Sequence, residues 1–485
     1  MQYVAYASKP SQIGSIQGTG SPSATGRRTF TTASPSRHDR KTLNGVKMIT
    51  VLRLILSVLG LTVGASGFAA ELQSAINADY PSLGALYRQL HAHPELSSHE
   101  IETAKIMAQQ ARDAGLTVTE HVGGTGVVAL LKNGAGPVVM IRTELDALPV
   151  EEDTGLPFSS HVRVKNAKGE EVPVAHACGH DLHMTVWAGT ARRLVAERDH
   201  WSGTLIMIAQ PAEETATGAK AMLADGLFTR FPRPDYNLSV HDIVGLPAGT
   251  IGLHAGPLKS AVDSLDLDIR GVGGHGALPQ NTKDPIPLAA AIINALQTLV
   301  SRNNNPFEPA VVTVGSVHGG VKHNIIADSV KLEVSVRSVN EAQRKMLLDG
   351  IQRIAINEAR AYGMPEDKMP SLKIVESTKV TYNSPKLVER LRPILMAAMG
   401  SAVVREGEPL MTSEDFSEYG WVEPRIPSAQ IWLGAVDPDI YAKTVDKSTL
   451  PGTHSPKWAP DAEPTIKTGI MTLTLAALNL MAKTK

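Results

Sequence analysis

The sequence predicts an α/β fold in which a mixed sheet flanked by helices is interrupted by a smaller, ferredoxin-like α+β unit. From residue 72 onward, apolar residues at helical spacing alternate with short apolar runs typical of strands. A β-α-β-β-α-β order then occupies residues 257–377, and helical patterns return after it. Strands separated by helices favour a sheet that carries helices on its faces.

The part with the mixed sheet contains the expected helices and strands on both sides of residues 257–377. Ser97 or Ser98 is expected to cap the helix at 100–114, which Gly115 ends. The other expected helices are 72–91, 184–197, 385–399 and 466–481, and the expected strands are 116–120, 126–131, 138–142, 204–210, 237–240 and 430–433.

The smaller unit has its own pattern of elements. Its expected elements are the strand 264–269, the glycine-rich loop 271–276, the helix 287–301, the strands 310–317 and 331–336, the helix 340–362 and the strand 372–375.

Charge is distributed unevenly along the chain. The first 70 residues hold eight Lys or Arg and one acid, whereas the remainder holds 39 basic and 47 acidic residues. An acidic body is a poor partner for phosphate backbones, so we expect no binding to nucleic acid. The chain has one cysteine, which excludes an intrachain disulfide.

Residues 48–70 have the order of a secretory signal peptide. Lys47 and Arg53 flank the start of an apolar run, and small residues lead to Ala69 and Ala70, where cleavage is expected. This order predicts a periplasmic or secreted protein; a membrane anchor and an organelle transit peptide are the alternatives. Residues 1–47 are expected to be a disordered extension, or to precede the true start at Met48.

The segment His176-Ala-Cys-Gly-His-Asp181 is the strongest chemical signal. Cys178 and His180 can present a thiolate and an imidazole to one metal ion, although such a site needs further ligands. Alone, the pair is better explained as a buried thiol beside a hydrogen-bonded histidine.

Two adjacent carboxylates follow the apolar strand 204–210. Adjacent carboxylates such as Glu213 and Glu214 usually form a solvated pair on the protein surface. These two follow an apolar strand, where burial is expected, and buried carboxylates would repel each other unless a cation lies nearby. We expect Glu214 to bind metal and Glu213 to act as general base toward water.

His241 and His454 supply further imidazoles at a strand end and in a loop. Together with Cys178, His180 and Glu214 they make five candidate ligands, a number that suits two divalent ions better than one. Thiolate and imidazole favour zinc; manganese, nickel and cobalt are the alternatives.

Six segments together resemble the amidohydrolase branch of the aminoacylase/carboxypeptidase metallopeptidases (peptidase family M20), which includes hippurate hydrolases and auxin-conjugate hydrolases. They follow one another in the family's order and read His91-Ala-His-Pro-Glu-Leu96, Arg142-Thr-Glu-Leu-Asp-Ala-Leu-Pro149, His176–Asp181, Pro211-Ala-Glu-Glu214, Gly273-Gly-His-Gly-Ala-Leu-Pro279 and Ser413-Glu-Asp-Phe416.

The resemblance implies a catalytic domain made of residues 71–256 and 378–485, interrupted by a lid or dimerisation domain at 257–377. It implies the same five metal ligands and the same base. It adds His275, which in relatives steadies the oxyanion, often from the partner subunit, and Asn324 as a substrate contact. A homodimer follows from this lid arrangement.

One position departs from the family pattern. Glu144 stands where the branch commonly has aspartate, so a role in orienting a ligand histidine would require a shift of the backbone or of its target. Asp146 could share this supporting role.

We therefore expect a metal-dependent amidohydrolase that cleaves N-acyl amino acids or short peptides, with Glu213 as general base and His275 stabilising the oxyanion. The first alternative is a thiol hydrolase that uses Cys178 as nucleophile with His180 or His183 as base. The second is a non-catalytic, metal-containing binding protein.

Overall fold

The computed structural model describes residues 43–166 and 168–483, and Leu61–Lys485 forms one compact unit. Residues 1–42 of the predicted extension lie outside the described part. The first helix, α1 (Leu43–Ala92), begins well before the predicted residue 72. Residues 43–71 contain no proline and many strong helix formers, so nothing in them ends the helix. The signal peptide stays a prediction.

Among residues 43–166 and 168–483, no helix combines the length and the apolar character needed to cross a membrane.

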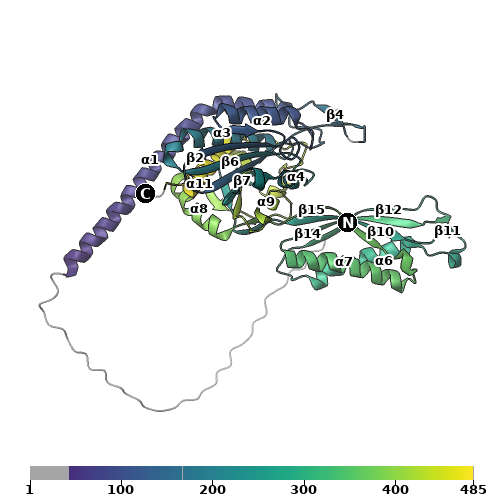
Figure 1. The fold of residues 1–485 in the computed structure, drawn as a ribbon. Coiled ribbons are helices and arrows are strands. Elements are labelled where there is room, and N and C mark those ends of the chain that lie inside the picture. Colours follow the sequence, from purple (N-terminus) through teal and green to yellow (C-terminus); the bar gives the residue numbers. More distant parts are fainter. Residues whose placement is uncertain (1–42, 167, 484–485) are drawn as a thin grey trace, which may run out of the picture. The chain divides into compact units, whose positions relative to one another are not determined.

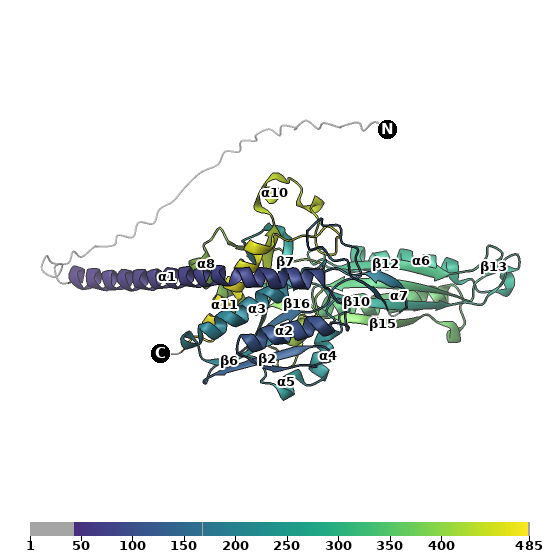
Figure 2. The same cartoon turned by 90° about the horizontal axis from the view of Figure 1, so that it is seen from above.

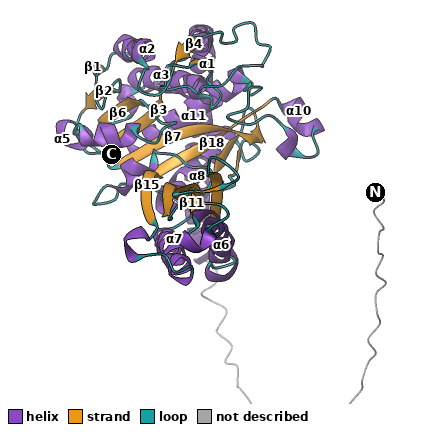
Figure 3. Ribbon diagram, turned by 90° about the vertical axis from the view of Figure 1, so that its right-hand side faces the viewer, coloured by secondary structure: helices purple, strands orange, loops and turns teal. Residues whose placement is uncertain are grey.

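The larger part is built on an eight-stranded mixed sheet in the order β1-β2-β6-β3-β7-β18-β8-β17 (Figures 1 and 3). Its four central strands, β6, β3, β7 and β18, run parallel to their neighbours within this group. The strands are β1 (Thr117–Thr119), β2 (Val127–Asn133), β3 (Val138–Glu144), β6 (Gly203–Gln210), β7 (Tyr236–Pro247), β8 (Ile251–Leu253), β17 (Val404–Glu406) and β18 (Ser428–Val436).

Helices cover both faces of this sheet, because successive strand residues point to opposite sides. Val139 and Ile141 of β3 join a core with α1, α2, α3, α8 and α11, whereas Met140 joins a core with α4, α5 and α9. Figure 2 shows α3 and α11 side by side, in agreement with their extensive contact. The helices are α2 (Ile101–Asp113), α3 (His180–Ala196), α4 (Gly218–Ala224), α5 (Leu227–Arg230), α8 (Pro385–Met399), α9 (Ser417–Trp421), α10 (Pro438–Lys443) and α11 (Ala462–Leu480).

The smaller unit is a four-stranded antiparallel sheet in the order β12-β14-β10-β15, which is the strand order of a split β-α-β ferredoxin-like fold. Its two helices lie side by side and pack on the sheet (Figure 1). The elements are β10 (Ala261–Arg270), α6 (Pro285–Thr298), β12 (Val311–Gly319), β14 (Ser329–Ser338), α7 (Glu341–Ala361) and β15 (Ser371–Thr378). The predicted fold class is confirmed.

Several short elements were not predicted, because three or four residues carry no clear periodicity. They include the hairpin β4 (Arg163–Lys165) and β5 (Glu171–Pro173), the pair β9 (Gly256–Lys259) and β16 (Thr381–Asn383), and the pair β11 (Gly274–His275) and β13 (Ile325–Ile326).

The predicted serine cap of α2 is wrong. The residue before this helix is Glu100, whose side chain does not cap it, and the carboxylate of Glu95 accepts from the backbone N–H groups of Glu102 and Thr103 instead. Ser97 instead donates its hydroxyl to Asp146, at 2.6 Å. The serine therefore serves the neighbouring loop rather than the helix.

The core of the smaller unit should be sensitive to truncation. Leu332 of β14 is fully buried, so Leu332→Ala is expected to lower the free energy of unfolding by about 2–5 kcal/mol, measured by chemical denaturation. Val317→Ala, at a side chain 55% exposed, is the matched control and should change it by less than about 1 kcal/mol. Equal losses in both variants would contradict this core.

Candidate active site

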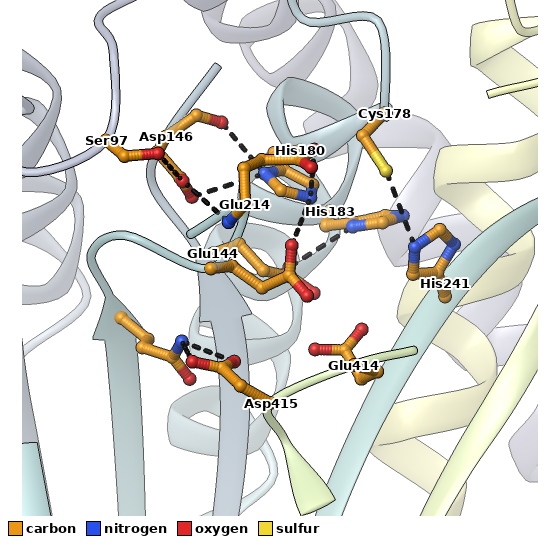
Figure 4. A network of polar contacts seen from close by, with 12 residues as sticks. Ser97, Glu144, Asp146, Cys178, His180, His183, Glu214, His241, Glu414 and Asp415 are labelled. Atoms are coloured by element: carbon orange, nitrogen blue, oxygen red, sulfur yellow. Dashed lines mark hydrogen bonds and ion pairs between the residues drawn. The ribbon is translucent and has the colours of Figure 1, made fainter. Parts of the chain in front are cut away.

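The five candidate ligands converge where the central strands end. Cys178 and His180 precede or open α3, Glu214 follows β6, His241 lies in β7, and His454 lies in the loop before α11. A cavity of about 450 Å³ is lined by four of them, together with Glu213. Figure 4 shows Cys178, His180, Glu214 and His241 grouped around one space. The carboxyl ends of parallel strands are the usual position for a site in such a sheet.

Distances between the donor atoms are short enough for a shared centre. Cys178 Sγ lies 3.7 Å from His241 Nε2, and Glu214 lies 3.4 Å from His454 Nε2. His180 Nε2 lies 3.8 Å from the other oxygen of Glu214. Ligand atoms of Cys178, Glu214 and His454 fall within 4.8 Å of one another, and so do those of His180, Glu213 and Glu214. Glu214 thus belongs to both groups of donor atoms, the one with Cys178 and His454 and the one with His180 and Glu213.

The tautomers of two histidines are fixed by backbone carbonyls. His180 Nδ1 donates to the carbonyl of Asp146, and His241 Nδ1 donates to the carbonyl of Asp242, each at 2.8 Å. Because a carbonyl only accepts, each ring carries its proton on Nδ1 and presents a lone pair on Nε2. Metal-binding histidines are commonly oriented in this way.

A divalent cation would satisfy atoms that the protein leaves without a partner. His180 Nε2 and Glu214 Oε1 are buried and make no hydrogen bond within the described part of the chain. Such atoms normally cost stability unless something binds them. Thiolate, imidazole and carboxylate together form a donor set suited to zinc and related metals. The residues therefore fit a metal centre.

Gly179 allows Cys178 and His180 to flank one turn. Its φ is +76°, and a Cβ at this position would lie 2.2 Å from Asp242 Oδ2. Only glycine meets both requirements without strain. His180 is the first residue of α3, so the helix begins earlier than the predicted residue 184.

Asp146 supports two of the candidate ligands. One of its oxygens accepts from the backbone N–H of Glu214 at 2.9 Å, and the other lies 3.6 Å from His180 Nδ1. Ser97 donates to the first of these oxygens. The predicted supporting role therefore has a geometric basis at Asp146.

Glu144 contacts His183 and none of the three candidate ligand histidines. Its carboxylate pairs with Arg142 and lies 3.2 Å from Nδ1 of His183, whose Nε2 lies 3.2 Å from Asp242. Burial opposes ionisation, but the charge of Arg142 lowers the pKa of Glu144 to about 2. The longer side chain therefore reaches His183, which is none of the five candidate ligands.

Glu213 and Glu214 lie in a site that disfavours negative charge. Burial raises the pKa of Glu213 well above its usual range, and the carboxylates of Glu414 and Glu214 add to this shift. Burial likewise raises the pKa of Glu214 to about 7, although His180 opposes the change. A bound cation would favour the ionised forms of both groups.

Sequence reasoning missed the cations around this site. Arg142 is fully buried and pairs with Glu414 at 2.8 Å and Asp415 at 2.9 Å. Lys259 pairs with the other oxygen of Glu414 at 3.2 Å, and with Arg337 of β14 it lines the 450 Å³ cavity. An arginine within the apolar strand 138–142 was the available signal for the first of these.

The structure does not bring His275 and Asn324 to the ligands within one chain. Both belong to the segments around β11 and β13, where the N–H of Gly276 donates to the carbonyl of Asn324 at 2.8 Å. Both are exposed, and neither lines the cavity beside Glu213.

Comparison with known proteins places these features in a family. The model of peptidase family M20/M25/M40 matches residues 140–451. Thermostable carboxypeptidase 1 of Saccharolobus solfataricus is 33% identical, over 82% of this chain and 94% of its own length. Hippurate hydrolase of Campylobacter jejuni is 36% identical, over 68% of this chain and 82% of its own length.

A solved structure is also similar. The YXEP protein of Bacillus subtilis, a dinuclear metal-binding peptidase of the M20 family, has a TM-score of 0.66 and 29% identity, covering 84% of this chain and 99% of its own.

The raised pKa of Glu214 predicts how the metal-free protein responds to pH. The pKa of Glu214 in the folded protein, about 7, exceeds the ordinary value near 4.3. Protonation of Glu214 therefore contributes its whole share of the unfolding free energy at pH values below the ordinary one. This contribution is lost as the pH rises toward 7. Unfolding free energies of the metal-free protein should therefore fall between about pH 4.5 and pH 7, and Glu214→Gln should reduce this decline.

Glu366→Gln, at a side chain 77% exposed, is the control and should leave the decline unchanged. An equally steep decline in the Glu214→Gln variant would show that another group causes it.

Proposed function

Because the chain belongs to peptidase family M20/M25/M40 and is a hydrolase, we propose that it is a metal-dependent amidohydrolase acting on N-acyl amino acids or short peptides. One observation carries this proposal: Glu213 lies beside the ligand group, 3.9 Å from His180 Nε2, while its neighbour Glu214 lies between the ligands. A structural metal would not need this second carboxylate.

The metal centre of the proposal holds two divalent ions, with zinc favoured over manganese, nickel and cobalt. Their ligands would be Cys178, His180, Glu214, His241 and His454. When bound, such ions polarise a carbonyl group and lower the pKa of water.

Glu213 moves the proton in this proposal. Its carboxylate faces the cavity, accepts a proton from the attacking water and then delivers it to the amine that leaves. Burial and the surrounding carboxylates raise the pKa of Glu213, and a bound cation would favour the ionised form that can accept this proton.

Cations on the cavity wall account for binding of the amino-acid part. Arg337 reaches the cavity and donates to Ser413 at 3.0 Å, and Lys259 has one carboxylate partner among its described neighbours. A substrate carboxylate would gain charge-assisted hydrogen bonds from these groups.

Two further features belong to the proposal. The active form would be a homodimer, in which His275 of a second copy stabilises the oxyanion and Asn324 contacts the substrate. The protein would reach the periplasm or the outside of the cell through the signal peptide of residues 48–70.

The thiol alternative has less support from the site. Burial raises the pKa of Cys178 well above its usual range, so the free thiol resists ionisation. Of its two candidate bases, His183 has carboxylates at both nitrogens, and His180 has Nδ1 bonded to the carbonyl of Asp146 and Nε2 directed to Glu214.

Replacement of the base should separate catalysis from metal binding. Glu213→Gln is expected to lower kcat by about 10²–10⁴-fold while metal content, measured by elemental analysis, stays near that of the wild type. Glu366→Gln, at a side chain 77% exposed and outside the cavity, is the control and should leave kcat unchanged. Unchanged turnover in the Glu213→Gln variant would remove this residue from the mechanism.

Chelation distinguishes the alternatives. Removal of metal should abolish hydrolysis of an N-acyl amino acid, and added zinc, manganese, nickel or cobalt should restore it. Full activity after verified metal removal would favour the thiol mechanism. Full metal content without turnover of any N-acyl amino acid would favour the non-catalytic alternative.

A further inference from the structure

A second and larger cavity lies beside the candidate metal ligands. Its volume is about 1,020 Å³, and its wall comes from the segment between α1 and α2, from α2, from residues 147–149 and from the β4–β5 hairpin. Of the candidate ligands only Glu214 lines this space, and Glu213 does not line it.

The wall of the second cavity is mostly apolar. Leu96, Ile106, Leu148, Val162 and Val164 line it, and each is only half-buried. Apolar side chains that face a cavity of this size are typical of a binding site for an apolar group.

Glu214 is common to the walls of the two cavities. This residue lines both of them, whereas Cys178 and His241 line only the first cavity, and Ser97 lines only the second. Figure 4 shows Ser97 on one side of Glu214, and Cys178 and His241 on the other. A substrate whose reacting carbonyl lies at Glu214 could therefore extend in both directions.

The geometry of an amide assigns the two ends of the substrate. The groups on the carbonyl carbon and on the nitrogen of a trans amide point away from each other. The first cavity carries Lys259 and Arg337 and thus suits the charged amino-acid part, whereas the second suits an apolar group.

We propose that the second cavity binds the acyl part of the substrate, and that this acyl group is a long aliphatic chain or an aromatic ring. The preferred substrates are then N-acyl amino acids with a bulky apolar acyl group rather than an acetyl group. This inference rests on the proposed amidohydrolase function.

Because the second cavity is large, the dependence of kcat/KM on the length of the acyl chain tests whether that chain binds there. An acetyl group would leave most of about 1,020 Å³ unfilled. Each buried methylene contributes about 0.8 kcal/mol, which corresponds to roughly a fourfold gain in kcat/KM until the chain extends beyond the cavity.

A substrate series tests this on the metal-loaded protein. The acetyl, butanoyl, octanoyl and benzoyl derivatives of one amino acid are compared by kcat/KM, and the octanoyl derivative is expected to exceed the acetyl derivative at least tenfold. Val164→Asn should lower kcat/KM for the octanoyl substrate about tenfold and change it for the acetyl substrate less than twofold.

Arg163→Asn provides the matched control on the same strand. Arg163 is exposed and lies outside the cavity wall, and its guanidinium pairs with Glu151. It should leave kcat/KM for both substrates unchanged. Calorimetry of wild-type protein with octanoate and with butyrate gives a measurement that does not depend on a variant folding, and octanoate should bind at least tenfold more tightly.

The outcomes separate the two proposals. Hydrolysis of the acetyl substrate as efficiently as the octanoyl substrate, with equal binding of the two carboxylates, would overturn the acyl cavity and leave the amidohydrolase function standing. No hydrolysis of any derivative at full metal content would overturn both. Equal losses on the two substrates in Val164→Asn, together with a changed oligomeric state in solution, would assign the cavity to a second copy of the chain instead.

Discussion

The site depends on one buried cation. Arg142 is completely enclosed, and its guanidinium pairs with Glu144, Glu414 and Asp415. These partners join the end of β3 to the loop before α9, although more than 260 residues separate them in the chain. Without the arginine, Glu144 and Asp415 would lose their guanidinium partner and Glu414 would be left with the cation of Lys259. Loss of one partner in such a group typically costs about 3–5 kcal/mol.

The same ion group extends to the candidate ligands through a series of contacts. Glu144 reaches His183, His183 reaches Asp242, and the backbone carbonyl of Asp242 accepts from the ligand candidate His241. The indole N–H of Trp458 also donates to the carboxylate of Asp242, at 3.0 Å. The orientation of an imidazole at the centre is thus tied to a charge pair several side chains away, as is common for metal-binding histidines.

Sequence reasoning succeeded where a residue's neighbours in the chain decide its role. Periodicity predicted the α/β fold class and the β-α-β-β-α-β order of the smaller unit, which the structure confirms. Residue type and spacing predicted the ligand candidates, whose role stays a prediction. It failed where a partner distant in sequence decides. Ser97 was assigned to a helix, but its acceptor is Asp146, and Glu144 was related to a ligand, but its partner is His183. Tertiary contacts of this kind leave no local pattern.

The order of the candidate ligands along the chain affects how the centre can form. Four precede the inserted unit, whereas His454 comes nearly 80 residues after it and is held by a bond from its own N–H to the carbonyl of Ala177. During synthesis, the first part of the sheet can fold while this imidazole has not yet left the ribosome. The proposed set of five donors would therefore need the chain on both sides of the inserted unit, and a chain that stopped before residue 454 would lack one of them.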